Sequence, residues 1–178
     1  DGGGALMNQG IHTVDLLQWM MGPVESVAGF KATLAHTNIE VEDTAAASIR
    51  FANGAIGTIG CTTSMWPGHF RLVEVAGDQG TAALADSKFL FWRFAKETVR
   101  DDEIRRQYVE FPGAGVGASN PSAGLSCAGH QANLAQFIEA IEAGTEPMIS
   151  GPEARKSVEI ILAIYESART GRPVALSR

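Results

Sequence analysis

Three polar residues near the start of the chain have types and spacing that suit acid–base chemistry. Asn8, His12 and Asp15 follow one another at intervals of four and three residues, and three glycines at positions 2–4 precede them. On a helix this spacing places the three side chains on one stripe. An imidazole beside an amide and a carboxylate can be held in one tautomer, which a proton-transfer group requires. A solvated helix face is the alternative explanation, and the spacing alone does not decide between the two.

Other residues with chemical potential lack a supporting pattern. His69 and His130 could join His12 in a metal site, but their spacing follows no ligand motif, so we expect no bound metal. Trp66 and Trp92 could stack against a sugar, although packing in a core or an interface is the usual role of such aromatics.

The glycine-rich stretch 113–118, "GAGVGA", fits the dinucleotide pattern G-x-G-x-x-A. That motif needs a helix to begin inside it, so that the pyrophosphate meets the helix N-terminus. Here Asn120 and Pro121 follow instead, and the acidic residue at a suitable distance, Glu139, falls within an expected helix. We therefore interpret the stretch as a loop and assign no cofactor-binding residue to this chain.

The polar stripe needs a helix to carry it, and the surrounding sequence predicts one over residues 9–21. Gly22 and Pro23 end this helix, as a glycine past the last turn and a following proline commonly do. Its length is about three turns. Apolar residues recur at helical spacing on the face opposite the stripe: Ile11, Val14, Leu17 and Met21.

Residues 24 to about 111 predict a mostly antiparallel or mixed sheet of about six strands. A strand over 24–35 and a polar loop precede strands 44–51 and 56–63, which Asn53 and Gly54 join in a hairpin. Two more strands surround the turn 77–80. Further strands are expected at "KFLFWRF" (88–94) and "QYVEF" (107–111).

Two helices are expected to close the chain. The first covers 131–143 and ends at Gly144, with Leu134, Phe137, Ile138 and Ile141 on one face. The second begins at Ser150 with a capping box to Glu153 and ends at Gly171; its expected apolar face comprises Val158, Ile161, Leu162 and Tyr165. A helix, a run of strands and two helices predict an α+β fold with an open-faced sheet and helices packed on one face.

Small residues alternate in the stretches 45–49 and 55–60, "AAASI" and "AIGTIG". They predict a flat outer sheet face that could meet a second sheet, so we expect a homo-oligomer built through this face. A solvated face is an equally good interpretation of the same pattern.

The composition limits the possible classes of protein. The chain has 178 residues, of which 45% are hydrophobic, so we expect a single domain over 1–178 with a sizeable core. A net charge of −6 disfavours nucleic acid as a partner. The apolar runs are too short to cross a membrane. Cys61 and Cys127 form no ligand or disulfide pattern, which suggests a reducing, cytoplasmic location.

Four segments together resemble one family along the whole chain. They are "GGGALMNQGIHTVDLLQWMMG", "EDTAAASIRFANGAIGTI", "VAGDQGTAAL" and "SGPEARKSVEIILAIYESARTGRPV". The chain resembles the C-terminal domain of the glucose-fructose oxidoreductase / inositol dehydrogenase / rhizopine catabolism (Gfo/Idh/MocA) family. The opening pattern G-G-G-x-L-x-x-x-G-x-H-x-x-D is its most specific part.

The resemblance implies a fold like the C-terminal domain of glyceraldehyde-3-phosphate dehydrogenase. It implies that an N-terminal Rossmann domain, absent from this chain, binds NAD or NADP, and that the open sheet face forms homodimers or homotetramers. It also implies that the complete protein is an oxidoreductase, which transfers hydride between nicotinamide and a hydroxyl or carbonyl of a sugar, inositol or related compound. The chain alone is then expected to be inactive.

By position in the family's pattern, His12 corresponds to the active-site histidine, and Asn8 stands where many members have an aspartate. Asn8 cannot carry a charge or accept the proton, so it could only orient the imidazole or hydrogen-bond a substrate hydroxyl. Gly10 and Asp15 would lie beside the substrate. The alternative from another class is a non-catalytic sugar-binding or oligomerisation module. A metal-dependent isomerase or hydrolase built on His12, His69 and Asp15 is a more distant third.

Overall fold

A computed structural model of the chain describes residues 3–110 and 127–176. The chain separates into two compact units, which are described one at a time. The first comprises residues 1–64 and 124–178, and the second comprises residues 65–123. Whether the two act as a single domain stays a prediction.

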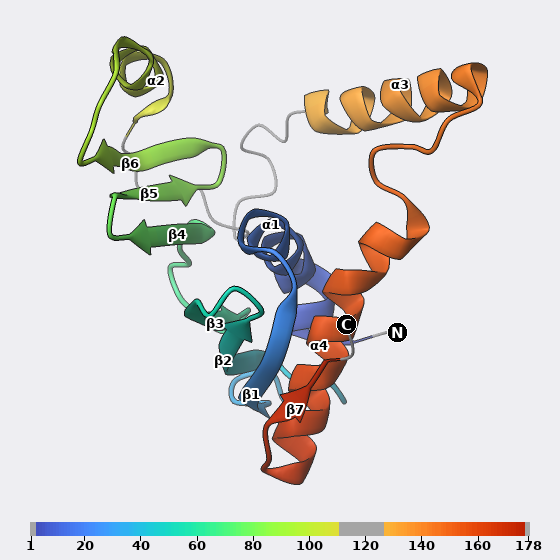
Figure 1. Ribbon diagram of the computed structural model, residues 1–178. Helices are drawn as coiled ribbons and strands as arrows, with labels where there is room; N and C mark the ends of the chain where they lie inside the picture. The colour runs from blue at the N-terminus through green and yellow to red at the C-terminus, as the bar shows by residue number, and fades with distance from the viewer. Residues whose placement is uncertain (1–2, 111–126, 177–178) are drawn as a thin grey trace. The chain divides into compact units, whose positions relative to one another are not determined.

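A four-stranded antiparallel sheet is the framework of the first unit (Figure 1). Its strands are β1 (Val24–Ala32), β2 (Thr44–Phe51), β3 (Ile56–Thr62) and the short β7 (Val174–Ala175), in the order β3-β2-β1-β7. The predicted hairpin between β2 and β3 is confirmed. Gly54 in its turn has a φ of 90°, a conformation that glycine adopts at little cost.

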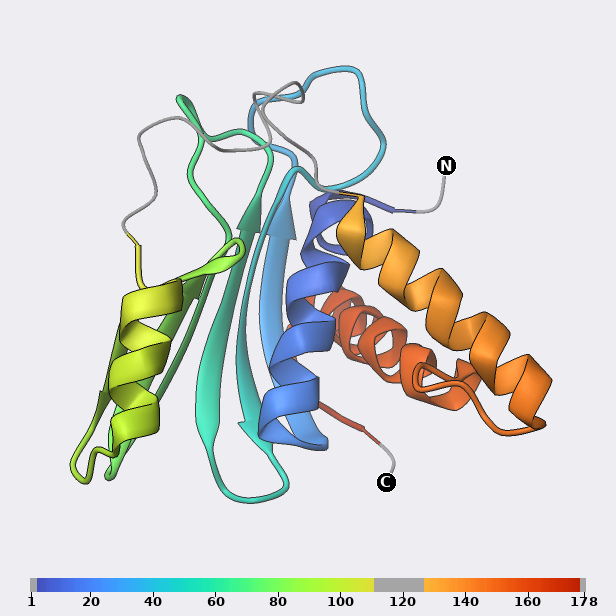
Figure 2. The ribbon, with the colours of Figure 1, turned by 90° about the horizontal axis from the view of Figure 1, so that it is seen from above.

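Two helices cover one face of this sheet, α1 (Ile11–Met21) and α4 (Gly151–Thr170), as Figure 2 shows. Side chains in β2 alternate between buried and exposed, as expected for a sheet covered on one face. The buried face of β2 packs against α4 in the core: Ala45, Ala47, Ile49, Phe51, Ile160, Ile161, Ala163 and Ile164. The prediction of helices on one sheet face is therefore confirmed for this unit.

The helix predicted to carry the polar stripe is confirmed, but it begins earlier than expected. A single π-helical turn, η1 (Leu6–Gly10), leads directly into α1. Gly22 ends α1 with a φ of 85°, and its N–H donates to the carbonyl of Gln18 at 2.8 Å. On the apolar face Val14 is buried, and Ile11, Leu17 and Met21 are partly buried against the core.

The two C-terminal helices are confirmed, with corrections to their details. Helix α3 (Ala128–Ala143) ends at Gly144 as predicted. In α4 the predicted capping box does not form, because the Ser150 side chain makes no cap hydrogen bond. The Glu153 carboxylate instead accepts a hydrogen bond from Gln18 and pairs with Lys156.

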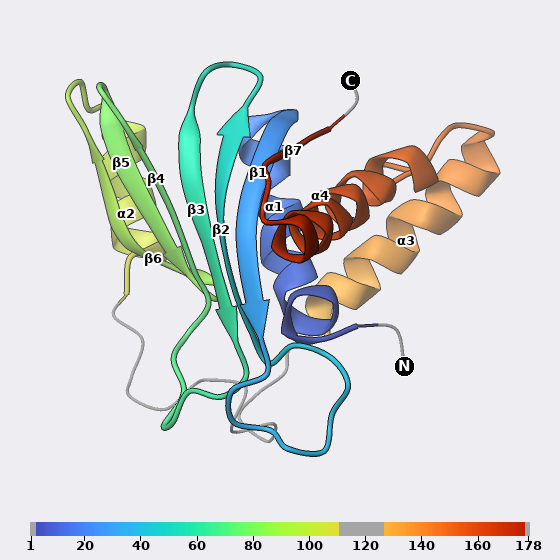
Figure 3. The same ribbon diagram turned by 90° about the horizontal axis from the view of Figure 1, so that it is seen from below.

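The predicted apolar faces differ in burial between these helices. In α3 the predicted apolar residues are exposed: Leu134, Phe137, Ile138 and Ile141. In α4 the buried face is rotated from the predicted one, with Ile160 and Ile164 buried and Leu162 about half exposed. Figure 3 shows the C-terminal end of α4 beside β1 and β7, with α1 on the same side.

A three-stranded antiparallel sheet and one helix form the second unit. Its strands, in the order β4-β5-β6, are β4 (Leu72–Gly77), β5 (Gly80–Ala85) and β6 (Lys88–Phe94). The expected turn at 77–80 and the strand at 88–94 are confirmed.

The strand predicted at 107–111 is wrong over residues 107–110, and residue 111 lies outside the described residues. Helix α2 (Val99–Tyr108) occupies its first residues, and Val109 makes only an isolated bridge to Phe89. A capping box between Thr98 and Asp101 starts this helix, a signal that the apolar "YVEF" pattern obscured. The indole N–H of Trp92 donates to Asp101 at 2.9 Å, and this bond helps to lower the pKa of Asp101 to about 2.

The α+β class and the antiparallel pairing are thus confirmed, whereas the single sheet of six strands is corrected to two sheets. The "GAGVGA" stretch at 113–118 lies outside the described residues. Among the residues described, no helix has both the length and the apolar character that crossing a membrane requires.

Candidate functional site

The three residues of the polar stripe sit at the start of the N-terminal helix. Asn8 belongs to the π turn η1, and His12 and Asp15 belong to the first half of α1. Asn8 and His12 are exposed, and Asp15 is partly buried. Within the described parts of the chain, their side chains make no hydrogen bond or ion pair. The imidazole of His12 therefore makes no bond within the described residues that would compete with a bound molecule.

The π turn lies where the stripe begins. Single π turns are rare and often occur at functional sites. The wider turn changes the rotation between Asn8 and His12 from the α-helical value that their spacing implies. The structure therefore keeps these residues on one helix but modifies the stripe that the sequence predicts.

Gly10 faces the sheet through the sulfur of Cys61. A methyl group at Gly10 would lie 3.1 Å from the Cys61 Sγ, tighter than ordinary packing. Burial, with the nearby negative charge of Glu42, raises the pKa of the Cys61 thiol. Close packing against Cys61 thus explains why a glycine stands at position 10. The contact of Gly10 with a substrate stays a prediction.

Glu42 is a buried carboxylate at the start of the helix. It lies in the connection between β1 and β2, and only 4% of its surface is exposed. Its Oε1 accepts hydrogen bonds from the backbone N–H of Leu6 at 3.0 Å and from the hydroxyl of Tyr165 at 2.8 Å. Its backbone carbonyl accepts the N–H of Ala5 at 2.9 Å. No motif or spacing in the sequence predicts a role for this residue.

Gly4 and Tyr165 both contact the buried carboxylate of Glu42. A side chain at Gly4 would collide with the backbone oxygen and the carboxylate of Glu42, so the last of the three opening glycines makes room for it. Burial, followed by the hydrogen bond to Glu42, raises the pKa of Tyr165. The ammonium of Lys31 lies 4.7 Å from the centre of the Tyr165 ring, a cation–π contact.

The adjacent Asp43 organises the loop before β2. It is fully buried, and its carboxylate accepts the backbone N–H groups of Leu34, Ala35 and His36 at 2.8–3.0 Å. These hydrogen bonds, that from His36 first, hold the pKa of Asp43 well below its ordinary value. The segment 36–43, predicted only as a polar loop, is in fact held by a buried charge.

Three hydroxyls cluster where β2 begins and β3 ends. The oxygens of Thr44, Thr62 and Ser64 lie 2.9–3.1 Å from one another. The N–H of Thr63 donates to the carbonyl of Asp43 at 2.9 Å. This cluster links the end of the β2–β3 hairpin to the loop that Asp43 holds.

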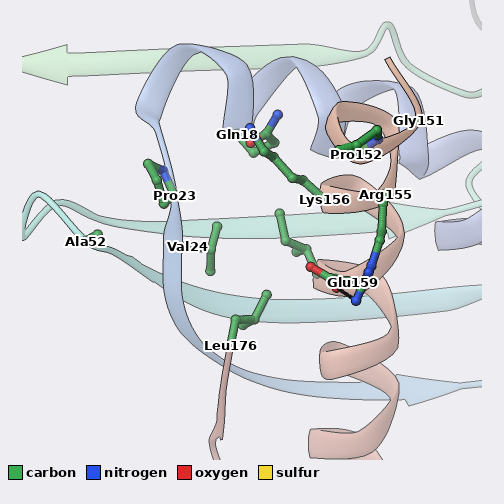
Figure 4. Close-up of a pocket in the computed structure, with 11 residues that line it drawn as sticks. Gln18, Pro23, Val24, Ala52, Gly151, Pro152, Arg155, Lys156, Glu159 and Leu176 are labelled. Carbon is green, nitrogen blue, oxygen red and sulfur yellow. Dashed lines mark ion pairs between the residues drawn. The ribbon is translucent and has the colours of Figure 1, made fainter. Parts of the chain in front are cut away.

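A pocket with a volume of about 770 Å³ lies near the far end of α1. Its walls come from Gln18, from Pro23 and Val24 at the start of β1, and from the first turns of α4 (Figure 4). Arg155 on its wall pairs with Glu159 at 2.6 Å. None of the three stripe residues lines this pocket.

The remaining residues singled out in the sequence are dispersed. His69 and His130 are exposed, and within residues 3–110 and 127–176 no cluster of three or more His, Cys, Asp or Glu could hold a metal. Trp66 is 90% exposed. Trp92 packs edge-on against Phe89 and Phe94, as a structural aromatic does.

Comparison with known proteins supports the resemblance. A family model described as "GFO/IDH/MocA C-terminal domain" matches residues 1–83. The structure of the WlbA dehydrogenase from Bordetella pertussis, in complex with NADH and UDP-GlcNAcA, is 34% identical with a TM-score of 0.83, over 99% of this chain and 49% of that one. The WlbA dehydrogenase of Chromobacterium violaceum, also in complex with NADH and UDP-GlcNAcA, is 34% identical with a TM-score of 0.79, over 98% and 46% of the two chains.

A curated relative adds to these structures. The scyllo-inositol 2-dehydrogenase (NAD(+)) of Bacillus subtilis (strain 168) is 24% identical over 98% of this chain and 48% of its own length. The chain thus spans about half the length of the relatives it matches. Since family model, curated relative and solved structures agree, the chain belongs to the Gfo/Idh/MocA oxidoreductase family, whose C-terminal domain it carries.

Proposed function

We propose that the chain forms the substrate-binding and oligomerisation half of an NAD(P)-dependent oxidoreductase. The enzyme transfers hydride between nicotinamide and a hydroxyl or carbonyl of a sugar, inositol or related compound. The observation that carries the proposal is the exposed side chain of His12, which makes no hydrogen bond or ion pair with the described residues and lies at the start of a helix in a domain of this family. Histidine suits this role because one ring nitrogen can accept a proton while the other donates a hydrogen bond.

In this proposal His12 is the acid–base group. It accepts the proton of the substrate hydroxyl on oxidation and returns it to the carbonyl oxygen on reduction. Asn8 donates or accepts a hydrogen bond to a substrate hydroxyl or to the imidazole, since an amide offers both donors and an acceptor. Gly10 and Asp15 complete the substrate contacts along the same stretch of helix.

The nicotinamide cofactor would accept or supply the hydride. In the described part of the chain no helix starts from a glycine-rich turn that follows a strand, which is the arrangement that holds a pyrophosphate. These residues therefore do not fit the nucleotide, and the proposal assigns its binding to another domain of the complete protein.

The relatives indicate which compounds to test first. The WlbA structures contain NADH and UDP-GlcNAcA, and the Bacillus subtilis relative is an inositol dehydrogenase that uses NAD⁺. We propose NAD⁺ as the first cofactor, and a UDP-sugar acid and scyllo-inositol as the first substrates. Asn8, in place of the aspartate common in the family, favours starting with the nucleotide sugar, because some sugar-nucleotide members are similar at this position.

The outer face of the four-stranded sheet supports a homo-oligomer, dimeric or tetrameric. Phe30 of β1 and Ile56 of β3 are 80% and 78% exposed on the face opposite α4. Large exposed apolar residues on a flat sheet of small neighbours favour burial against a second copy. Light scattering on the intact enzyme tests this part of the proposal, and a monomer at micromolar concentration would refute it.

The decisive experiment measures NADH formation by the full-length enzyme with each candidate substrate. We expect His12→Ala to lower turnover by about 100-fold or more, while cofactor affinity stays unchanged. His69→Ala is the matched control, because His69 is exposed and lies in the other unit. Near-normal turnover of His12→Ala would contradict the assignment of His12. Substrate binding without turnover in the unaltered enzyme would favour the non-catalytic module.

A further inference from the structure

The helix that carries Asn8 and His12 has no cap of its own. The first N–H groups of a helix need acceptors, and a side chain at the N-cap usually supplies one. Neither η1 nor α1 has a side-chain cap hydrogen bond. Glu42, 36 residues after Leu6, instead accepts the N–H of Leu6 through its carboxylate and the N–H of Ala5 through its carbonyl.

The same carboxylate oxygen connects the helix start to α4. Tyr165 donates its hydroxyl to the Oε1 that Leu6 also uses. Tyr165 belongs to the helix whose Ile161 and Ile164 are fully buried in the core, so its backbone is well anchored. Glu42 therefore joins the start of this helix to α4.

Hydrogen-bond donors and the helix dipole stabilise the buried carboxylate of Glu42. The carboxylate forms no ion pair with any residue that the structure describes, and a buried charge without a cation needs hydrogen-bond donors. Leu6 and Tyr165 supply two donors, and the positive end of the helix dipole favours a negative charge at this position. Gly4 has no side chain that would push the carboxylate away.

We propose that Glu42 is a positioning residue for the acid–base reaction. By holding the N–H of Leu6 against α4, it sets the position and rotation of the turn from which Asn8 and His12 extend. Tyr165 fixes the carboxylate in the orientation that receives Leu6. This inference rests on the proposed function of His12, and it adds two residues that do not themselves touch the substrate.

The test compares four variants of the full-length enzyme. Glu42→Ala removes the two bonds that the carboxylate accepts, from Leu6 and Tyr165, and leaves the backbone carbonyl that accepts the N–H of Ala5. Glu42→Gln keeps a side-chain amide oxygen that can accept the two bonds. Glu40→Ala is the matched control, because Glu40 is an exposed glutamate in the same loop. Asp43→Ala is a second control that removes a buried carboxylate that does not bond to the helix.

Two measurements are made on each variant: amide hydrogen exchange at Ala5 and Leu6, and kcat with KM on the folded enzyme. We expect Glu42→Ala to speed exchange at Leu6, which loses its acceptor, more than at Ala5, whose acceptor is the retained backbone carbonyl. We also expect it to lower kcat by about 10- to 100-fold, because displacing a catalytic group by about 1 Å has effects of this size. The KM for the cofactor should not change. Glu42→Gln should recover most of the kcat, and Asp43→Ala should lower the melting temperature with little effect on kcat.

Tyr165→Phe gives a second, milder perturbation. It removes one donor but leaves the Leu6 bond, so we expect kcat to fall by about threefold, a fraction of the energy of one hydrogen bond. The chain has one other tyrosine, Tyr108, which is exposed in the second unit. Tyr108→Phe is therefore the matched control and should behave as the unaltered enzyme.

Each outcome decides the proposal. Unchanged exchange at Leu6 in Glu42→Ala would overturn it, and so would faster exchange with an unaltered kcat, which would leave Glu42 a purely structural role. If His12→Ala retains normal turnover, the proposed function of His12 fails and the positioning role fails with it. If His12→Ala is inactive while Glu42→Ala keeps full kcat, only the positioning role fails.

Discussion

Two polar regions of this domain lie close together in the fold and differ in how they use their polar groups. The side chains of Asn8 and His12, at the start of the N-terminal helix, are exposed and make no hydrogen bond to the described residues. Glu42 and Asp43, in the connection that precedes β2, are buried, and both carboxylates accept several hydrogen bonds. The first region has unused bonding capacity, and the second has almost none.

This difference separates two kinds of contribution. A group that acts on a substrate must keep its donors and acceptors available until the substrate binds. A group that holds a scaffold contributes most when it is buried and fully bonded, because removing it leaves unsatisfied donors in the interior. Changes in the first region should therefore alter activity at constant stability, and changes in the second should lower stability.

The largest loss of stability is expected from Gly4→Ala. The added methyl group would collide with the backbone and carboxylate of Glu42, so the helix start or the loop must move. We expect the free energy of unfolding to fall by about 3 kcal/mol, the upper range for overpacking in an interior. Urea denaturation followed by circular dichroism measures it. Gly60→Ala is the control, because a methyl group there meets no atom within 4 Å; equal effects of the two substitutions would show that the packing at Gly4 is not special.

A smaller loss, with a defined pH dependence, is expected from Asp43→Ala. The three amides at 34–36 lose their acceptor, and we expect the melting temperature at pH 7 to fall by about 5 °C. The folded-state pKa of Asp43 lies below its unfolded value of about 3.9, so its contribution is complete above pH 3.9 and declines as the pH falls toward the folded value.

The difference in melting temperature between Asp43→Ala and the unaltered protein should therefore be constant from pH 5 to pH 8 and shrink below about pH 4. Thermal scans across this range, with Glu40→Ala as the exposed control, provide the measurement. A difference that grows on acidification would mean that the charge of Asp43 does not stabilise this loop.

The sequence was sufficient to predict the elements that depend on local signals. The helix before Gly22, the hairpin at Asn53 and Gly54, and the helix end at Gly144 are confirmed, because the chain itself supplies the turn or the stop. Spacing also predicted which residues share a face of α3. It could not predict that this face is exposed, because periodicity does not specify what covers a helix.

In the candidate site, too, local spacing was predictable and contacts between distant residues were not. The spacing of Asn8 and His12 was visible, since both lie on one helix. The role of Glu42 was not, because its partners Leu6 and Tyr165 are 36 and 123 residues away. A signal existed in the adjacent acidic residues Glu42 and Asp43, which directly precede the apolar strand β2. One sequence, however, does not show whether such carboxylates are buried.

The smallest effect is expected from Asn8→Ala, and it tests the exposed region most directly. The side chain of Asn8 is exposed and makes no hydrogen bond to the described residues, so the free energy of unfolding should stay within about 0.5 kcal/mol of the unaltered value. If its amide bonds to a substrate hydroxyl, kcat/KM should fall by about 3- to 10-fold, the effect of losing one hydrogen bond. Steady-state kinetics with Gln9→Ala as the exposed neighbouring control measures this change. A loss of stability without a loss of kcat/KM would place Asn8 with the scaffold of Glu42 and Asp43, and the division between the two regions would no longer hold.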